Sequence, residues 1–201
     1  MPEAAKAVFG ANLPLAMAYA DALVRDGDEL GLLGPRELPK LWTRHILNSA
    51  VVAELVEPGQ SVADVGSGAG LPGIPMAIAQ PEAQFTLIEP MERRSTWLAE
   101  QVKTLGLKNV KVLRARAEEV GEVFDVVTAR AIKALPQLLQ MTVPMTRAGG
   151  RIIALKGAKA AEEIEDSKRL IKKLKLESFD IVLTGSQFLE EPTRVVVTKL
   201  G

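Results

Sequence analysis

The chain has no cysteine and only one histidine, His45. Without cysteine there can be no disulfide, no thiolate nucleophile and no cysteine-ligated zinc or iron–sulfur site. A single histidine also excludes a histidine-rich metal site, and we expect no metal ion in this protein. Any chemistry must therefore run without these groups.

Aromatic residues are scarce, at 4%, and the net charge is zero because 25 Lys and Arg balance 25 Asp and Glu. We expect a core of Val, Leu, Ile and Ala, which fits an α/β protein. Neutrality argues against a protein that coats nucleic acid through bulk electrostatics, although local patches remain open. With 201 residues, 47% of them hydrophobic, the chain has the size of one globular domain.

Long apolar runs are missing as well. Residues 13–20 are apolar and end in Ala18-Tyr19-Ala20, which resembles a signal-peptide cleavage site. However, only Lys6 precedes them as a basic residue, Pro14 interrupts them, and no other run approaches the length needed to cross a bilayer. We therefore expect an amphipathic helix in a cytoplasmic protein that has no membrane contact.

The charges are unevenly distributed along the chain. Residues 147–175 contain nine basic side chains against four acidic ones, which favours an anionic partner, with a solvated helix face as the alternative. The basic residues are Arg147, Arg151, Lys156, Lys159, Lys168, Arg169, Lys172, Lys173 and Lys175, and the acidic ones are Glu162, Glu163, Glu165 and Asp166.

Residues 1–57 are expected to form an N-terminal helical cap on a core of residues 58–201, in one structural domain overall. Two helices are predicted, at 2–25 and 38–56, separated by a loop with Gly and Asp residues. In the second helix Pro39 suits the first turn, and apolar residues recur at helical spacing. This stripe contains Leu38, Leu41, Trp42, Ile46, Ala50 and Ala53, and His45 falls on it too.

Short β-rich runs alternate with helices after Pro58-Gly59. The pattern predicts strands at 61–65, 84–89, 110–113, 124–128 and 150–155, with helices at 73–80, 91–105 and 135–146. Such alternation implies right-handed crossovers and a parallel sheet with helices on both faces, whose ligand binds beyond the carboxyl ends of the strands.

The C-terminal part departs from this alternation. A basic helix at 159–176 leads to strands at 178–184 and 193–199, and their connection is too short for a crossover, so we expect antiparallel neighbours. The predicted fold is thus Rossmann-like, a mostly parallel seven-stranded sheet with an antiparallel C-terminal hairpin. It resembles the class I S-adenosylmethionine-dependent methyltransferases.

A glycine-rich run, DVGSGAGLPG at residues 64–73, follows the first predicted strand and opens a helix. Glycines such as Gly66 and Gly68 let the backbone turn sharply and approach a ligand, and a helix N-terminus offers unpaired amides. Glu89 ends the next strand, where a carboxylate can accept hydrogen bonds from both hydroxyls of an adenosine ribose. Loop and acid together indicate a cofactor that contains a nucleoside.

Two cofactors compete for this loop, since Gly68, Gly70 and Gly73 also satisfy the fingerprint of dinucleotide binding. Asp64 decides between them. A carboxylate at the strand end suits the cationic methionine end of S-adenosylmethionine and would repel a pyrophosphate. The sequence therefore favours S-adenosylmethionine, with a dinucleotide-dependent oxidoreductase as the remote alternative.

The glycine run has further neighbours of a recognisable kind: LWTRHILNS precedes it, and FTLIE, TARA and ALKG follow. Together these segments resemble the bacterial small-subunit (16S) ribosomal RNA guanine-N7 methyltransferase family, also called glucose-inhibited division protein B. The resemblance covers roughly residues 38–199, and LPGIP is its most specific element. Asn48 departs from it, because many members carry aspartate there.

The resemblance implies roles for individual residues. It puts Gly66 and Leu71 against the methionine part of the cofactor, Glu89 on the ribose and Ala117-Glu118 on the adenine. Arg130 would lie beside the transferred methyl group as the catalytic residue and contact the cofactor. For Glu118 an acidic first helical turn is the structural alternative, and for Arg130 it is a surface ion pair.

Three residues are expected to contact RNA: Arg44, His45 and Lys156. Arg44 lies off the apolar stripe, and Lys156 belongs to the ALKG turn, so both suit a phosphate. His45 has a buried core position as its alternative. The resemblance names the partner as 16S ribosomal RNA or the small ribosomal subunit, and we expect a monomer.

The expected chemistry agrees with the missing residues. Guanine N7 has a lone pair and no proton to remove, so placement supplies much of the rate and no general base is needed. The lack of cysteine argues against methylation at pyrimidine carbon 5, which uses a thiolate adduct. The resemblance places the target guanine near the decoding centre. The alternatives are another RNA position, a protein or a small molecule as the methyl acceptor.

Overall fold

The protein is described by a computed structural model that covers residues 1–130, 133–157, 160–174 and 176–201. Within these residues, seven strands form one sheet in the order β3-β2-β1-β4-β5-β7-β6. The strands are β1 (Ser61–Val65), β2 (Gln84–Ile88), β3 (Val110–Leu113), β4 (Phe124–Arg130), β5 (Thr146–Leu155), β6 (Leu176–Thr184) and β7 (Thr193–Leu200).

The first five strands are parallel, and β7 pairs antiparallel with both β5 and β6. The predicted fold class is thereby confirmed, including the C-terminal hairpin. The predicted bounds agree closely, except that β5 begins at Thr146, four residues before the expected start at Gly150. Of the sequence patterns discussed above, Ala131 of TARA and the basic residues Lys159 and Lys175 lie outside the described residues.

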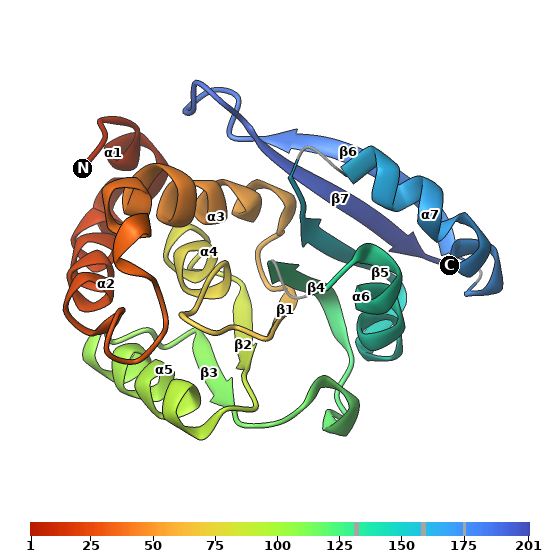
Figure 1. The fold of residues 1–201 in the computed structure, drawn as a ribbon, viewed down its shortest axis with the longest axis horizontal. Coiled ribbons are helices and arrows are strands. Elements are labelled where there is room, and N and C mark those ends of the chain that lie inside the picture. Colours follow the sequence, from red (N-terminus) through yellow and green to blue (C-terminus); the bar gives the residue numbers. More distant parts are fainter. Residues whose placement is uncertain (131–132, 158–159, 175) are drawn as a thin grey trace.

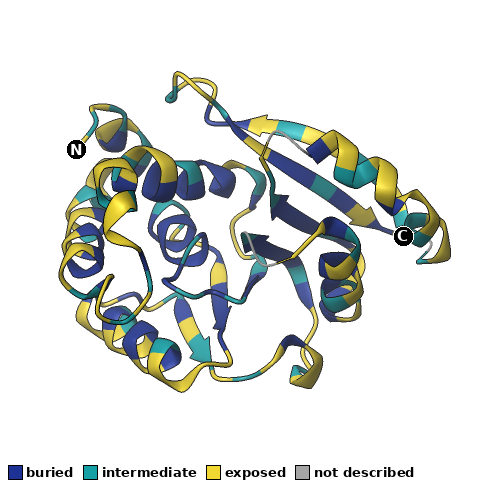
Figure 2. Ribbon diagram, in the orientation of Figure 1, coloured by how far each residue is buried: buried dark blue, intermediate teal, exposed yellow. Residues whose placement is uncertain are grey.

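Helices cover both faces of the sheet (Figure 1). Side chains alternate along each strand, so Val62, Phe85 and Val126 pack on one face while Ala63 and Val127 pack on the other. The first face is covered by the N-terminal cap with α4 (Gly73–Ala79) and α5 (Glu92–Thr104), and the second by α6 (Leu135–Thr142) and α7 (Ala160–Lys173). The central strands lie between these two layers as the most buried part of the chain (Figure 2).

The first predicted cap helix is nearly correct. It consists of α1 (Ala4–Phe9), a 3-10 turn η1 (Gly10–Asn12) and α2 (Leu13–Asp26). By length and composition alone, Ala4–Asp26 passes the test for a membrane-crossing helix, but this is weak evidence because core helices pass the same test. One side of α2 is fully buried against the core, as the expected amphipathic helix requires.

The second predicted cap helix is wrong in its type. Instead of one α-helix at 38–56, the chain forms the 3-10 segment η2 (Pro35–Lys40), the π-helix η3 (Leu41–Leu47), a turn of α3 (Asn48–Ala50) and the 3-10 segment η4 (Val51–Leu55). The apolar stripe still faces inward, since burial decides which side is covered and tolerates a change in helical pitch. Pro39 lies inside η2 and not in the first turn of an α-helix.

Candidate cofactor site and the arginine beside it

The glycine loop after β1 has a left-handed backbone at three positions. Gly66, Gly68 and Gly70 have φ angles of 66°, 55° and 85°, which glycine adopts without steric cost. The amides of Gly66 and Ser67 donate to the carbonyl of Ile88 at 2.8 and 3.1 Å, so the end of β2 holds the start of the loop. The sequence therefore fixes both the shape and the place of this loop.

Asp64 and Gly73 join the loop to the start of α4. The Gly73 amide donates to Asp64 Oδ2 at 3.0 Å, and a Cβ at Gly73 would lie only 2.6 Å from that oxygen and 2.3 Å from Leu87 Cδ2. The third glycine of the fingerprint thus allows close packing of α4 against the sheet. Asp64 was expected to face the cofactor, and here its Oδ2 supports the protein backbone.

The other oxygen of Asp64 has unused hydrogen-bonding capacity. Asp64 is fully buried, and Oδ1 has no hydrogen-bond partner among the described residues. Burial raises the pKa of Asp64 to about 7, and the hydrogen bond from Gly73 opposes this rise. A buried carboxylate oxygen without a partner is costly. A cationic ligand group beside Oδ1 would relieve this cost, so the residue fits the cofactor predicted for it.

Glu89 lies at the end of β2, facing the same loop. Its carboxylate is buried and accepts the amide of Gly68 at Oε2 and the amide of Met91 at Oε1, both at 2.9 Å. Each carboxylate oxygen keeps a second lone pair after accepting one bond. Glu89 can therefore shape the loop and still accept from ribose hydroxyls.

The predicted adenine contacts lie after β3, in a 3-10 turn η5 (Ala117–Glu119). Ala117 is buried and Glu118 is exposed. The neighbouring Glu119 accepts the amide of Arg116 at 2.8 Å, so one acid of this turn has the structural role named as the alternative. The contact of Glu118 with adenine stays a prediction.

Two residues of the loop region complete its surroundings. Leu71 is partly buried and packs against the main core. Tyr19 of α2 is fully buried, and its hydroxyl donates to the Ala69 carbonyl at 2.6 Å. Sequence reasoning missed Tyr19, for which the only signal was that it is the single tyrosine of the chain.

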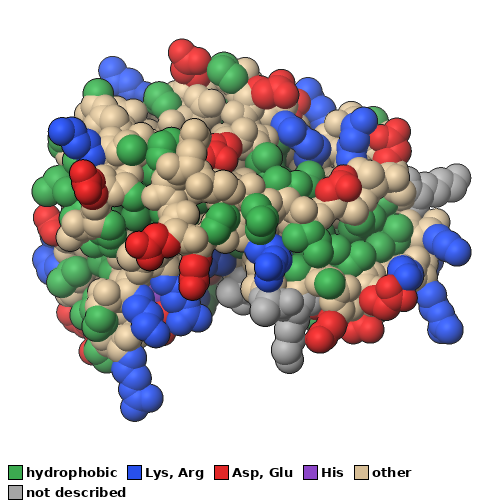
Figure 3. All heavy atoms as spheres, turned by 90° about the horizontal axis from the view of Figure 1, so that it is seen from above, with side chains coloured by type: hydrophobic (Ala, Val, Ile, Leu, Met, Phe, Trp, Pro, Cys, Tyr) green, Lys and Arg blue, Asp and Glu red, His purple; other side chains and the backbone are tan. Residues whose placement is uncertain are grey.

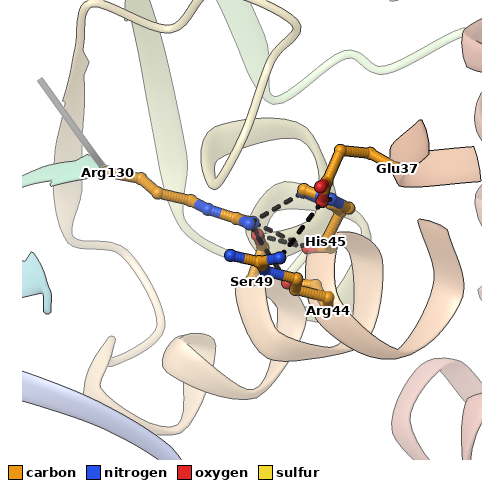
Figure 4. Close-up of polar contacts among 5 residues, drawn as sticks. All are labelled: Glu37, Arg44, His45, Ser49 and Arg130. Atoms are coloured by element: carbon orange, nitrogen blue, oxygen red, sulfur yellow. Dashed lines mark hydrogen bonds and ion pairs between the residues drawn. The ribbon is translucent and has the colours of Figure 1, made fainter. Parts of the chain in front are cut away.

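Arg130, at the end of β4, reaches across to the cap (Figure 4). Its Nη1 donates to the carbonyl of His45 at 3.2 Å and to Ser49 Oγ at 3.0 Å. Its Nη2 donates to the carbonyl of Arg44 at 3.1 Å and to His45 Nδ1 at 2.8 Å. These contacts are not the surface ion pair named as the alternative for Arg130; the guanidinium joins β4 to the π-helix, and its contact with the cofactor stays a prediction.

His45 is buried, 8% exposed, and is engaged at both ring nitrogens. Nε2 lies 2.7 Å from Glu37 Oε2, and Nδ1 faces Arg130. Burial lowers the pKa of His45, the Glu37 hydrogen bond opposes this, and the positive Arg130 adds to it. The buried alternative describes His45 better than a direct contact with RNA does.

The other two predicted RNA contacts differ in their surroundings. The Arg44 side chain is 58% exposed and lies 3.4 Å from Glu37, an exposed pairing that leaves it accessible. The Lys156 side chain is only 9% exposed, its Nζ lies 2.8 Å from Glu163 Oε2, and it donates to the Lys133 carbonyl. An RNA phosphate would have to compete with Glu163 for this ammonium group.

These residues meet at one edge of the sheet because the strands are parallel. Asp64 is in register with Thr128 of β4, and Val65 with Ile88 of β2. Asp64, Glu89 and Arg130 therefore sit at the carboxyl ends of three adjacent strands, where doubly wound sheets bind their ligands. Arg44 and His45 approach the same edge from the cap through their contacts with Arg130.

Comparison with known proteins identifies the family. The family model described as rRNA small subunit methyltransferase G matches residues 12–190. Two relatives named Ribosomal RNA small subunit methyltransferase G come from Paenarthrobacter aurescens (strain TC1) and Arthrobacter sp. (strain FB24). They are 51% and 52% identical, over 99% and 96% of this chain and 94% and 91% of their own length.

Solved structures resemble the fold. TYW2 of M. jannaschii in complex with AdoMet has a TM-score of 0.60 at 21% identity, covering 79% of this chain and 76% of its own. A SAM-dependent methyltransferase from Aquifex aeolicus has a TM-score of 0.56 at 17% identity, covering 77% of this chain and 89% of its own. Since the family model spans most of the chain and relatives about half identical cover nearly all of it, the chain belongs to the rRNA small subunit methyltransferase G family.

Proposed function

We propose that this chain transfers a methyl group from S-adenosylmethionine to N7 of a guanine in 16S ribosomal RNA, near the decoding centre. The observation that carries the proposal is the family match over residues 12–190. The geometry supports it independently, because a left-handed glycine loop faces a buried acid at the carboxyl edge of the sheet.

The residues at this edge fit S-adenosylmethionine. Glu89 would accept the ribose hydroxyls, and Gly66 and Leu71 would line the methionine part. Ala117 and Glu118 would contact the adenine, and Gly68 would also contact the cofactor. The free Oδ1 of Asp64 suits a cationic group. When bound, the cofactor supplies an activated methyl group on a sulfonium centre.

The chain contributes placement more than proton transfer. Guanine N7 attacks with its own lone pair, so the residues around it have to orient the base and exclude water. We assign Arg130 to the reacting end of the site, where its guanidinium is fixed by contacts with the π-helix. These contacts hold the positive charge of the guanidinium in one position at the carboxyl end of β4.

We place the RNA on the carboxyl edge of the sheet and not on α7. Helix α7 starts after β5 and runs back to the start of β6, which is parallel to β5, so its basic end lies at the opposite edge. A helix of 14 residues spans about 21 Å. Lys168 also pairs with Glu165 within the helix. These features favour the solvated face as the role of the basic run.

Exposed basic side chains lie closer to the site. Figure 3 shows charges of both signs over one face, with Lys and Arg side chains gathered at the lower left, over the cap half of the molecule. Cap residues and residues that follow the ends of β3 and β4 supply such side chains near the site. They are Arg36, Lys40, Arg44, Arg114, Arg116 and Lys133, all exposed.

The test uses the fixed positive charge that methylation gives the guanine ring. Purified protein and S-adenosylmethionine are incubated with bare 16S RNA and, separately, with small ribosomal subunits, and the RNA is then reduced and treated with aniline. Strand scission at one guanine is expected in at least one substrate. Methyl groups found only on a ribose hydroxyl, an exocyclic amine, a protein or a metabolite would refute the assignment.

We further propose that the enzyme acts in the cytoplasm as a monomer without membrane contact. Light scattering tests the oligomeric state, and cell fractionation tests the localisation.

A further inference from the structure

Three side chains that are far apart in the sequence form one hydrogen-bonded chain (Figure 4). Glu37 comes from η2, His45 from the π-helix η3 and Arg130 from the end of β4. The distances are 2.7 Å between Glu37 Oε2 and His45 Nε2, and 2.8 Å between His45 Nδ1 and Arg130 Nη2.

The direction of each hydrogen bond follows from the chemistry of arginine. A guanidinium has donors and no acceptor, so His45 Nδ1 must be the acceptor of the Arg130 bond. A neutral imidazole with a bare Nδ1 carries its proton on Nε2, and this N–H donates to the Glu37 carboxylate. Both hydrogen bonds therefore point the same way: Arg130 donates to neutral His45, and His45 donates to Glu37.

Protonated histidine cannot take the same place. A proton on Nδ1 would set two donors, both on cations, 2.8 Å apart. The titratable groups that act on His45 and Arg130, besides each other, are Glu37, Arg44, Asp64 and Tyr19, and Lys40 acts on Glu37. Burial raises the pKa of Tyr19, so its hydroxyl is neutral. Glu37 favours the imidazolium, while Arg130 and Arg44 disfavour it.

We propose that Glu37 and His45 are positioning residues for methyl transfer, which hold Arg130 in its working orientation through the neutral imidazole. This rests on the proposed function, since it assumes that Arg130 acts at the reacting end of the site. The remaining contacts of Arg130 go to Ser49 Oγ and to two backbone carbonyls, which do not titrate. Among the contacts of Arg130 in this cluster, only the hydrogen bond to His45 is therefore lost when a titrating partner is protonated.

One test reads the hydrogen-bond direction without any activity. Because His45 is the single histidine, labelling the protein with ¹⁵N-histidine gives ring signals from this residue alone. We expect a bare Nδ1 and a protonated Nε2 at neutral pH, and we expect Arg130→Gln to make protonation of the ring easier. A ring protonated at Nδ1 at neutral pH would overturn the proposal.

A second test separates turnover from binding. His45→Asn keeps an acceptor near the position of Nδ1 without a titrating group, whereas His45→Ala removes it. We expect His45→Ala to lower kcat about 10- to 100-fold with little change in KM for S-adenosylmethionine, as misplacement of a reacting group does. We expect kcat of the native enzyme to fall at acid pH as His45 becomes protonated. His45→Asn should keep most of the turnover and lack this fall.

Controls keep these outcomes interpretable. Glu37→Gln should shift the acid fall in kcat. Lys172→Gln, an exposed residue on α7 far from these three side chains, should leave kcat and its pH profile unchanged. Circular dichroism establishes that each variant is folded. Equal kcat values for His45→Ala and the native enzyme, or the same acid fall in His45→Asn, would overturn the positioning role. If the native enzyme is inactive on 16S RNA, the proposed function fails, but the ¹⁵N test still decides the hydrogen-bond arrangement.

Discussion

The burial of Asp64 predicts how the stability of the protein depends on pH. The residue is fully buried, one oxygen accepts the Gly73 amide, and the other has no partner among the described residues. The substitution Asp64→Asn keeps the size and the acceptor for Gly73 and removes the ionisation. Comparing it with the native protein therefore isolates the effect of the charge.

The magnitude follows from the raised pKa. Burial moves the pKa of Asp64 from 3.8 to about 7, so between these values the folded protein holds a proton that the unfolded chain has released. The stability this proton gives is complete below the unfolded pKa and is lost as the pH rises through the folded pKa. One pKa unit corresponds to about 1.36 kcal/mol. Compared with a pH below the unfolded pKa, Asp64 therefore lowers the free energy of unfolding by about 2 kcal/mol at pH 5 and by about 4 kcal/mol at pH 9.

The assay is urea unfolding of both proteins, without cofactor, from pH 5 to pH 9. The free energy of unfolding of the native protein should fall by about 2 to 3 kcal/mol more than that of Asp64→Asn over this range. Other titrating groups contribute equally to both curves and cancel in the difference. Parallel curves would mean that Asp64 is already ionised in the fold, and the reasoning from its burial would be wrong.

The same substitution tests the contact with the cofactor. If Oδ1 faces the cationic methionine end, binding should favour the ionised carboxylate and release a proton near pH 7. Calorimetry in two buffers of different ionisation enthalpy should detect this proton for the native protein and not for Asp64→Asn. Binding without proton release in the native protein would place the cationic group away from Asp64.

Three further predictions concern the loop and the RNA surface. Glu89→Gln should weaken S-adenosylmethionine binding by about 1 to 3 kcal/mol in calorimetry, because charge-assisted bonds to the ribose and to Gly68 are weakened; unchanged affinity would remove Glu89 from the site. Gly73→Ala should lower the free energy of unfolding by about 1 to 3 kcal/mol, because its Cβ would clash with Leu87 and Asp64 at 2.3 and 2.6 Å. A melting temperature equal to the native one would contradict this packing. Arg44→Glu should weaken 16S RNA binding and reduce its salt dependence. The matched charge reversal Lys172→Glu on α7 should change neither the affinity nor the salt dependence. If Lys172→Glu weakens binding and Arg44→Glu does not, the RNA-binding surface lies on α7.

Much of the fold was predictable from local patterns. The strands β1 and β3 have the predicted bounds, because each is a short valine-containing run bounded by polar residues or glycine. The antiparallel pairing of β6 with β7 followed from the length of one loop. The pitch of residues 35–55 was not predictable, because an apolar stripe specifies which side is buried and not whether the turns are α, 3-10 or π.

The candidate site divides in a similar way. Asp64, the glycines and Glu89 could be proposed for the cofactor site because each lies at or just after the end of a strand. The surroundings of Arg130 could not, because its partner His45 lies 85 residues earlier in the sequence. A pattern that reads neighbours along the chain contains no information about such a pair. For the same reason Lys156 appeared as a phosphate ligand, although the fold supplies it with Glu163.

The cap contacts three segments at the carboxyl ends of the parallel strands: the glycine loop after β1, the start of α5 after β2, and the end of β4. Tyr19 of α2 bonds to the glycine loop after β1, Arg93 and Arg94 after β2 donate to the carbonyls of Leu30 and Gly31 at 2.9 Å, and Arg130 at the end of β4 is held by the π-helix. These contacts comprise one hydrogen bond from Tyr19, one each from Arg93 and Arg94, and four from Arg130, and they join the cap to segments at the edge of the sheet that carries the proposed site. Loops alone are mobile, and a site needs its groups held within a fraction of an ångström. The N-terminal residues therefore hold the segments that the proposed reaction would use, and the position of the glycine loop depends on residues outside 58–201.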